Sequence, residues 1–208
     1  MANPNKKGNL IVLSAVSGAG KTTIANHLVK RDRSFVRSVS VTTRRRHPNE
    51  REGIDYYFVS QREFDDMIKN DMFLQYQLVH SHYYGTPKKY VVDNISKGKN
   101  VILVIDTKGG LNIKKMFADA ILIFILPPSL QDLIKRLNLR GRESAEEIER
   151  RIKNGKEELR DALNYDYIVI NDDIERAIQD IIAIVRVNNL TTKRNRDKVI
   201  KIMKEYEV

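Results

Sequence analysis

The chain has 208 residues, carries a formal net charge of +10 and contains no cysteine. Its length suits one α/β domain with inserted subdomains, and the lack of cysteine excludes disulfides and thiolate metal sites. The start of the chain has no apolar segment typical of a signal peptide, and the longest apolar run, residues 120–126, is far too short to cross a bilayer. We therefore expect a soluble, cytoplasmic protein.

The first functional signal lies at residues 14–23, Ser-Ala-Val-Ser-Gly-Ala-Gly-Lys-Thr-Thr. The apolar run before it predicts a buried strand over residues 10–14, and the apolar spacing after it predicts a helix over 21–31. Gly18 and Gly20 allow the backbone to bend so that successive N–H groups point at one anion. The start of the helix adds its partial positive charge, so this junction predicts a phosphate-binding loop.

Two side chains extend this phosphate site. Lys21 supplies a mobile cation for the outer phosphates, and the hydroxyl of Thr22 is suited to ligate Mg²⁺. The full pattern of such a loop has glycine where Ala15 stands in this chain. Alanine is compatible with that position if its φ angle is negative. An ordinary turn between a strand and a helix is the alternative interpretation.

A small, mostly β insertion is expected after the first helix. The β-branched residues of 35–44 favour a strand that ends in a polar and basic turn, and a second short strand is expected at 55–59. Ser60 with Glu63 predicts a capping box before a helix to about residue 70. Further strand and turn are expected over residues 72–86.

The α/β pattern then resumes. Helices are expected at 91–97, 109–117, 129–137, 145–164 (opened by a capping box of Ser144 and Glu147), 171–189 and, in a basic tail, 191–205. Apolar runs predict strands at 100–106, 120–126 and 167–170, so four apolar strands alternate with helices. This pattern predicts an α/β fold with a parallel sheet and helices on both faces. Ligands bind at the carboxyl ends of such strands, so Asp106 and the phosphate loop are expected to share a cleft.

Arginines gather in two segments that flank the predicted cleft. They are Arg44, Arg45 and Arg46 in the insertion, and Arg136, Arg140, Arg142, Arg150 and Arg151 around residues 139–143. Guanidinium groups match phosphate oxygens bidentately. Phosphoryl transfer to another phosphate needs no general base, only alignment, charge neutralisation and exclusion of water. Nucleic-acid binding and a plain basic surface would also fit the net charge, but this placement favours a small polyanionic substrate.

Eight motifs follow one another in order along residues 9–205. They are Ser14-Ala15-x-Ser17-Gly18-Ala19-Gly20-Lys21-Thr22, Ser38-Val39-Ser40-x-Thr42-Thr43-Arg44, Glu52-Gly53-x-Asp55-Tyr56-x-Phe58-Val59, Tyr83-Tyr84-Gly85-Thr86, Ile105-Asp106, Pro127-Pro128-Ser129, Arg140-Gly141-Arg142 and Val169-Ile170-Asn171-Asp172-Asp173. With these motifs the chain resembles bacterial guanylate kinases, and the resemblance implies transfer of the ATP γ-phosphate to GMP, which gives ADP and GDP. It also implies Mg²⁺ as a cofactor.

The resemblance implies a role for each matching residue. ATP would be bound by Ala15, Val16, Ser17, Gly18, Ala19, Gly20, Lys21, Thr22 and Thr23, with Thr22 as metal ligand and Asn171 near the adenine. The GMP phosphate would be held by Ser40, Arg44, Tyr56 and Tyr84, and the guanine would be read by Thr86 and Asp106. Catalysis would fall to Lys21, Arg44, Arg136, Arg140 and Arg151.

The same resemblance divides the single domain into parts. It implies a core of residues 8–35, 91–137 and 165–190, a nucleoside-monophosphate-binding insertion of 36–90, a lid of 138–164 and a basic tail of 191–208. The expected partners are the nucleotides ATP and GMP, with neither a membrane nor nucleic acid involved. The sequence leaves the oligomeric state open, a homodimer included.

Three positions depart from the family pattern. His47 stands where a second phosphate-binding arginine is expected, and a largely neutral imidazole makes no bidentate fork. Gln75 stands where a glutamate reads the guanine, and it offers one acceptor oxygen in place of a carboxylate. Val104 replaces an acidic residue before Asp106. These changes concern the identity of the phosphoryl acceptor, while the donor site keeps its pattern.

Three hypotheses remain open at this stage. The chain is a guanylate kinase, or it is a kinase of the same fold that prefers another acceptor, such as inosine monophosphate. The third alternative is a non-catalytic binding module of the guanylate-kinase type. The intact Gly20, Lys21 and Thr22 and the retained lid arginines argue against the third.

Overall fold

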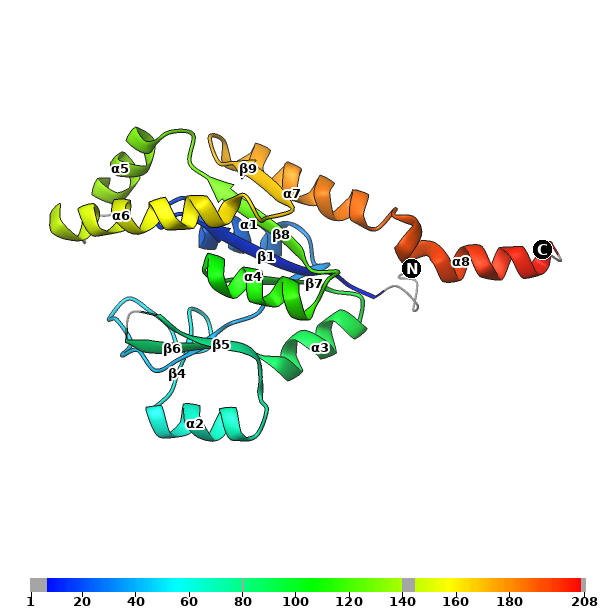
Figure 1. The fold of residues 1–208 in the computed structure, drawn as a ribbon, viewed down its shortest axis with the longest axis horizontal. Helices are drawn as coiled ribbons and strands as arrows, with labels where there is room; N and C mark the ends of the chain where they lie inside the picture. Colours follow the sequence, from blue (N-terminus) through cyan, green and yellow to red (C-terminus); the bar gives the residue numbers. More distant parts are fainter. Residues whose placement is uncertain (1–6, 80, 140–144, 207–208) are drawn as a thin grey trace.

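The structure, a computed structural model, describes residues 7–79, 81–139 and 145–206, and it describes only the backbone of residues 139 and 145–149. Its main sheet has five strands in the order β2-β7-β1-β8-β9, and all neighbours are parallel (Figure 1). The strands are β1 (Leu10–Ala15), β2 (Phe35–Arg37), β7 (Asn100–Val104), β8 (Ile121–Leu126) and β9 (Tyr167–Ile170). The expected α/β fold with a parallel sheet is confirmed.

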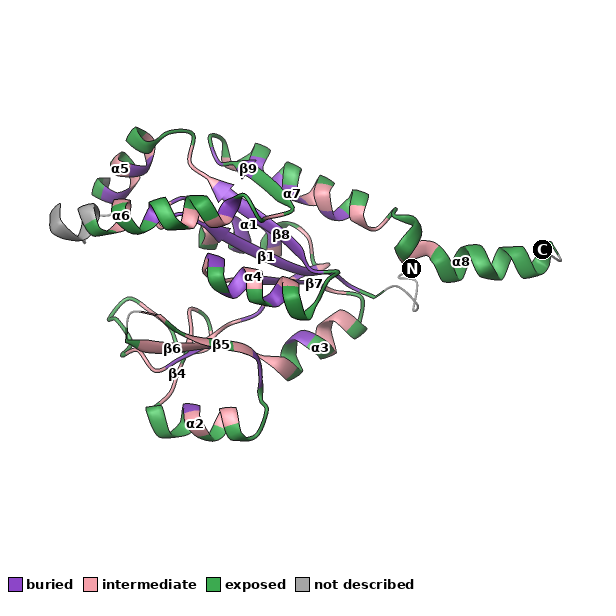
Figure 2. Ribbon diagram, in the orientation of Figure 1, coloured by how far each residue is buried: buried purple, intermediate pink, exposed green. Residues whose placement is uncertain are grey.

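Helices cover both faces of this sheet because successive strand residues point to opposite sides. Ile11 and Leu13 of β1 belong to an apolar cluster with residues of α1 (Lys21–Arg31) and α7 (Ile174–Asn188). Val12 belongs to a second cluster, with residues of α3 (Lys88–Ser96) and α4 (Thr107–Met116). The central strands are accordingly buried, and the outer helix faces are exposed (Figure 2).

Two further helices complete the first cluster near the carboxyl ends of the strands. α5 (Leu130–Leu139) contributes Leu133 and Leu137, and α6 (Ala145–Ala162) contributes Ala162. Both helices lie beside the phosphate loop that follows β1 (Figure 1). They are therefore placed to contribute side chains to a ligand bound there.

A second sheet contains β4, β3, β6 and β5 in that order. Its strands are β3 (Val41–Thr42), β4 (Tyr57–Phe58), β5 (Phe73–Val79) and β6 (His82–Pro87). α2 (Gln61–Lys69) packs on it through the fully buried Phe64, whose ring lies 4.5 Å from Phe73 and 5.4 Å from Tyr83, measured between centroids. This mostly β region thus has a small apolar cluster of its own.

The strand expected over residues 35–44 is in fact two strands. β2 joins the edge of the main sheet, where the Ser38 N–H donates to the Ile102 carbonyl oxygen at 2.9 Å, and β3 then joins the second sheet. Strand propensity marks the whole segment as extended but carries no signal for a change of partner. The main sheet therefore has five strands, where the apolar runs indicated four.

Two helices begin earlier than the sequence indicates. α3 begins at Lys88, directly after Pro87. α4 begins at Thr107, because Asp106 accepts a hydrogen bond from the Gly109 N–H at 3.0 Å and caps the helix. The poor helix propensity of glycine hides this start.

The expected helix caps have separate outcomes. Ser60 and Glu63 form the capping box of α2, and Ser129 accepts from the Asp132 N–H at 3.0 Å at the start of α5, so both predictions are confirmed. The capping box predicted from Ser144 and Glu147 lies outside the residues whose side chains are described.

The helix expected at 191–205 is present as α8 (Thr192–Glu205). It projects from the body of the molecule, and none of its residues is buried (Figures 1 and 2). Within the ranges that the structure describes, no helix combines the length and apolarity that a membrane span requires.

Candidate functional site

The phosphate loop follows β1 and leads into α1. Gly18 and Gly20 have φ angles of 98° and 103°, in the left-handed region that disfavours any side chain. A Cβ atom on Gly20 would lie 2.6 Å from Nδ2 of Asn171, so the loop has no room for one. Ala15 is not among the described residues with positive φ, so it meets the condition for standing where glycine is usual.

Two other segments support this loop. Asn171, which follows β9, donates through Nδ2 to the carbonyl oxygen of Ala19 at 2.7 Å. Arg136 of α5 donates to the carbonyl oxygen of Asn171, also at 2.7 Å. Lys21 turns back and donates to the Ala15 carbonyl oxygen at 3.1 Å. Asn171 and Arg136 therefore lie against the phosphate loop.

α6 contacts the same loop through two charged side chains. Nη1 of Arg151 donates to Oγ of Ser17 at 2.5 Å, and the Ser17 N–H donates to Oε2 of Glu158 at 3.2 Å. Further along α6, Asp161 accepts from the hydroxyl of Thr107 at 2.5 Å. This last bond ties α6 to the first residue of α4, so both helices are fixed around the loop.

Lys21, Asp106 and Glu158 form the charged centre of the site. Burial lowers the pKa of Lys21, and the carboxylates of Glu158 and Asp106 oppose this effect. Burial likewise raises the pKa of Glu158, against the attraction of Lys21 and the hydrogen bond from Ser17. The Ser14 hydroxyl donates to the carbonyl oxygen of Asp106 at 3.2 Å, so the phosphate loop and Asp106 lie in one site.

The sequence analysis missed Glu158 and Tyr165. The Tyr165 hydroxyl donates to Oγ of Ser14 at 2.8 Å, and burial raises its pKa, so the phenol stays protonated. A signal for Glu158 is present in the sequence: Arg151, Glu158 and Ala162 are spaced by seven and four residues and therefore share one helix face. Ala162 is apolar and belongs to the first apolar cluster, so this spacing indicates that Arg151 and Glu158 also turn inward.

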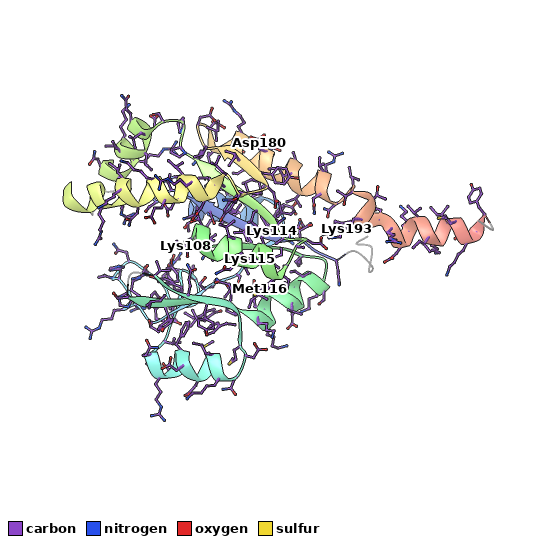
Figure 3. All side chains as sticks on the ribbon, viewed as in Figure 1. Lys108, Lys114, Lys115, Met116, Asp180 and Lys193 are labelled. Atoms are coloured by element: carbon purple, nitrogen blue, oxygen red, sulfur yellow. The ribbon has the colours of Figure 1, made fainter. Side chains whose placement is uncertain are left out.

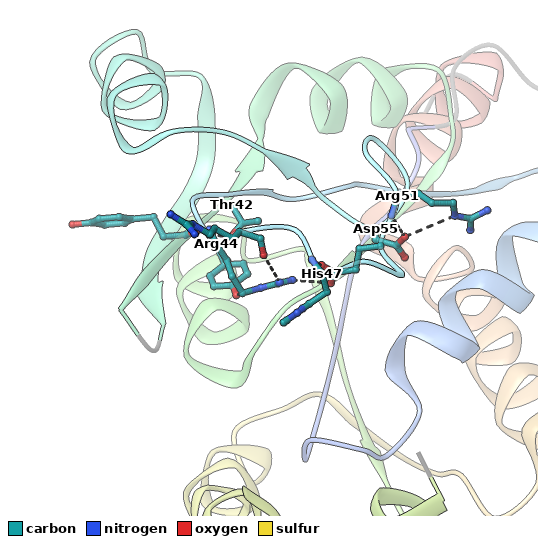
Figure 4. A network of polar contacts seen from close by, with 9 residues as sticks. Thr42, Arg44, His47, Arg51 and Asp55 are labelled. Atoms are coloured by element: carbon teal, nitrogen blue, oxygen red, sulfur yellow. Dashed lines mark hydrogen bonds and ion pairs between the residues drawn. The ribbon is translucent and has the colours of Figure 1, made fainter. Parts of the chain in front are cut away.

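Arg44 is the centre of a polar network at the second sheet (Figure 4). Its Nη2 donates to Oε1 of Glu50 at 2.7 Å, and its Nε donates to the Tyr84 hydroxyl at 3.3 Å. The guanidinium lies 5.4 Å from the ring centre of Tyr56. Glu50 also accepts from the backbone N–H of His47 at 2.9 Å. The structure thus brings together Arg44, Tyr56 and Tyr84, with His47 on the adjoining turn.

This network keeps Glu50 and Arg44 charged. Burial alone would raise the pKa of Glu50, but the hydrogen bonds from Arg44 and His47 hold that pKa below its usual value. Burial would lower the pKa of Arg44, but Glu50 and Tyr84 raise it. The guanidinium is therefore already neutralised by a carboxylate, and an incoming phosphate would have to share or take over this partner.

Gln75 of β5 and Thr86 of β6 face each other across the second sheet. Nε2 of Gln75 donates to Oγ1 of Thr86 at 3.3 Å. Oε1 of Gln75 is buried and has no hydrogen-bond partner among the described residues. A buried acceptor without a donor is unfavourable, so this oxygen is suited to a donor on a ligand.

Asp106 lies between the phosphate loop and the second sheet. A Cβ atom on Gly109, in the first turn of α4, would be 3.6 Å both from Oδ2 of Asp106 and from Nε2 of Gln77 in β5. β5 therefore packs against the turn that carries Asp106. Asp106 thus lies next to β5 of the second sheet as well as beside the strand that leads into the phosphate loop.

The remaining residues predicted for the site, where the structure describes them, have fewer contacts with the phosphate loop and with the network around Arg44. Thr22 and Thr23 are exposed in the first turn of α1. The Ser40 carbonyl oxygen accepts from the Tyr57 N–H at 2.9 Å. Val104 packs against the first apolar cluster. Arg140 lies outside the described residues.

A recess of about 380 Å³ lies at the amino-terminal ends of β8 and β9. α4 supplies Lys114 and α8 supplies Lys193 to its lining (Figure 3). Lys114 donates to Asp166 at 2.7 Å, and Lys193 pairs with Asp119. The recess is at the opposite end of the parallel strands from the phosphate loop, so it belongs to a different region of the molecule.

Comparisons with known proteins place the chain in a family. It matches the family model described as guanylate kinase over residues 7–188. A guanylate kinase of Caldanaerobacter subterraneus subsp. tengcongensis is 44% identical over 200 residues, which cover 96% of this chain and 97% of that protein. A guanylate kinase of Thermotoga maritima is 39% identical over 201 residues, which cover 97% of each.

A solved structure agrees with these relatives. The crystal structure of guanylate kinase from Anaplasma phagocytophilum superposes with a TM-score of 0.75 at 34% identity, and the match covers 91% of this chain and 90% of that one. The family model spans most of the chain, and the relatives exceed 30% identity over nearly its whole length. The chain therefore belongs to the guanylate kinase family.

Proposed function

We propose that this protein transfers the γ-phosphate of ATP to GMP, which gives ADP and GDP. One observation carries the proposal: Asp106 lies beside the strand that leads into the phosphate loop, where its carbonyl oxygen accepts from the Ser14 hydroxyl at 3.2 Å, and next to the second sheet, where Arg44, Tyr56 and Tyr84 gather. A donor and an acceptor that both carry phosphate would therefore meet between two groups of cationic and hydroxyl side chains. Membership of the guanylate kinase family supports the same reaction.

On the donor side, the backbone N–H groups of residues 15–23 bind the ATP phosphates, with the positive start of α1 behind them. Lys21 exchanges the Ala15 carbonyl oxygen for an outer phosphate oxygen, which is the stronger, charge-assisted partner. Arg136 and Asn171 keep the loop in place, and Arg151 lies at its entrance on Ser17. Arg140 would add charge to the transferring group.

A magnesium ion fits the donor set of this site. The described residues contain no cluster of three His, Asp or Glu side chains that would hold a metal alone, and the exposed Thr22 offers one hard hydroxyl oxygen. Magnesium is commonly held by one or two protein oxygens together with substrate phosphates. Bound there, it would neutralise charge on the phosphates of ATP.

On the acceptor side, Arg44, Tyr56, Tyr84 and Ser40 hold the GMP phosphate, with His47 on the same turn. Its oxygens are already ionised, so no general base is required, and these residues act by alignment. The guanine lies over Thr86, Gln75 and Asp106. The unpaired oxygen of Gln75 accepts one guanine N–H, and the Asp106 carboxylate accepts another.

The test is ADP release with a panel of acceptors. The purified chain is given ATP with Mg²⁺ and, separately, GMP, inosine monophosphate or adenosine monophosphate, and ADP is measured with a coupled assay. Turnover with GMP well above the others supports the proposal. Turnover with inosine monophosphate but not GMP would favour a changed acceptor, and no ADP with any acceptor would favour a binding module. The relatives reported above carry the name guanylate kinase, so the comparisons support neither alternative.

A further inference from the structure

Glu158 is an acidic side chain inside a site that is otherwise built to bind phosphate. Its Oε2 accepts from the backbone N–H of Ser17, a residue of the phosphate loop, at 3.2 Å. It also interacts with Lys21, the cation that the proposed function assigns to the outer phosphates. A carboxylate oxygen therefore accepts from a loop N–H and attracts the loop lysine, as a phosphate oxygen would.

Once ATP is bound, the charges around the Glu158 carboxylate make its position beside the phosphate loop energetically unfavourable. Asp106 on the turn before α4 and Asp161 on α6 are its acidic neighbours, and Lys21 is its positive neighbour. Arg151, also on α6, is bonded to the Ser17 side chain. A triphosphate in the loop would bring several more negative charges beside these three carboxylates and would compete for the same lysine. Like charges that lie close together repel each other substantially in a partly buried site.

We propose that the Glu158 carboxylate occupies the place of a phosphate oxygen in the nucleotide-free loop, and that ATP has to displace it. The inference rests on the proposed function, because it concerns the ATP site of that reaction. Glu158 therefore lowers the affinity for ATP, because it attracts Lys21 before the nucleotide binds.

The displacement requires only a change of side-chain rotamer. The helix around Glu158 is fixed, since Asp161 is bonded to Thr107 and Ala162 is buried in the main core. Gly155, one turn earlier, packs against the Val16 side chain. Because the backbone is held on both sides of residue 158, a change of side-chain rotamer is the smallest movement that takes the carboxylate out of the loop and leaves its partners to the phosphate.

The experiment measures ATP binding directly, without GMP. Mg²⁺–ATP is titrated calorimetrically into the wild-type chain, into Glu158→Gln and into Glu157→Gln. Glutamine keeps the shape of Glu158 and loses its charge, and Glu157 is its exposed neighbour on the same helix, so the second variant removes an equal charge without the contact. We expect Glu158→Gln to bind ATP about tenfold more tightly, which corresponds to about 1.4 kcal/mol, and Glu157→Gln to bind like wild type.

The dependence on pH gives a second readout. Burial raises the pKa of Glu158, so the carboxylate becomes protonated, and stops competing, at a higher pH than an ordinary glutamate would. As the pH falls through that raised pKa, ATP affinity of the wild type should approach that of Glu158→Gln. Protonation of ATP itself affects both proteins equally, so its contribution cancels when their affinities are compared.

The outcomes separate this inference from the proposed function. The inference would be overturned if Glu158→Gln bound ATP as weakly as the wild type or more weakly. It would also be overturned if the difference in ATP affinity between the wild type and Glu158→Gln persisted at low pH. In either case, GMP phosphorylation by the wild type would still support the proposed function. A wild-type chain that binds no ATP at all would overturn both.

Discussion

The donor and acceptor sides of the site are built in different ways. The phosphate loop lies on the main core and uses backbone groups; Asn171 is hydrogen-bonded to it, and Arg136 in turn is hydrogen-bonded to Asn171. The acceptor side uses side chains on a smaller sheet, and its central arginine, Arg44, is half-buried and paired with Glu50. A site built from backbone groups tolerates few substitutions, because the backbone must keep its geometry. In a site built from partly exposed side chains, individual residues can be replaced.

This difference agrees with the departures from the family pattern that the sequence resemblance implies. Those expected at His47 and Gln75 fall on the acceptor side, and the loop of residues 14–23 keeps the expected pattern apart from Ala15. His47 contributes its backbone N–H to Glu50, a contact that any residue except proline can make. The predictions below test the contrast, beginning with the largest expected effect.

Replacing Lys21 with alanine should remove nearly all turnover. The Lys21 ammonium group donates to the loop backbone at Ala15, and loss of a preorganised charge at the transferring group typically costs about 10²–10³-fold in kcat. The measurement is steady-state ADP release, with thermal unfolding as a check that the fold is intact. A kcat within tenfold of wild type would show that the loop lysine is not catalytic.

Two glycine substitutions compare the sides directly. Gly20→Ala puts a side chain at a φ of 103° and 2.6 Å from Asn171, and Gly85→Ala puts a Cβ atom 2.5 Å from the ring of Phe73. We expect the first to raise the KM for ATP and the second to raise the KM for GMP. A residue held in a disfavoured backbone region costs about 1–3 kcal/mol, so Gly20→Ala should also lower the melting temperature.

The two KM values are measured separately, each with the other substrate saturating. If both substitutions raised the same KM, the division of the site into a donor side and an acceptor side would be wrong.

The sequence predicts the donor side well because its signals are local. The apolar run, the glycines, Lys21 and the helix that follows are contiguous, so their chemistry can be read without a fold. The contacts of Asn171 and Glu158 with the loop join residues more than 130 positions apart, and only tertiary packing brings them together. The split of residues 35–44 between two sheets is invisible for the same reason, since each half has the same local preference.

Gln75→Glu should improve the use of GMP. The Gln75 oxygen is buried and has no hydrogen-bond partner among the described residues, and its amide nitrogen is bonded to Thr86, so one acceptor atom is left for the proposed guanine. A carboxylate offers charge-assisted hydrogen bonds worth roughly 1.5–3 kcal/mol, against about 1 kcal/mol for a neutral one. We therefore expect the KM for GMP to fall by about tenfold, with kcat nearly unchanged.

Inosine monophosphate is the matched control for this variant, because it lacks the N2 amino group of guanine. Its KM should fall less than that of GMP. An unchanged KM for GMP would mean that Gln75 does not contact the base.

His47→Arg should have the smallest effect. The His47 side chain is exposed on the turn beside Arg44, and its backbone bond to Glu50 survives the substitution. An exposed arginine would add a phosphate contact, but exposed ion pairs are worth only about 0.2–1 kcal/mol, so the KM for GMP should fall by no more than about fivefold. Because such a contact is screened, the gain should vanish at high salt, whereas the gain from Gln75→Glu, at a buried atom, should persist. Equal salt sensitivity of the two variants would contradict the view that the phosphate end of the acceptor site is open to solvent while its base end is enclosed.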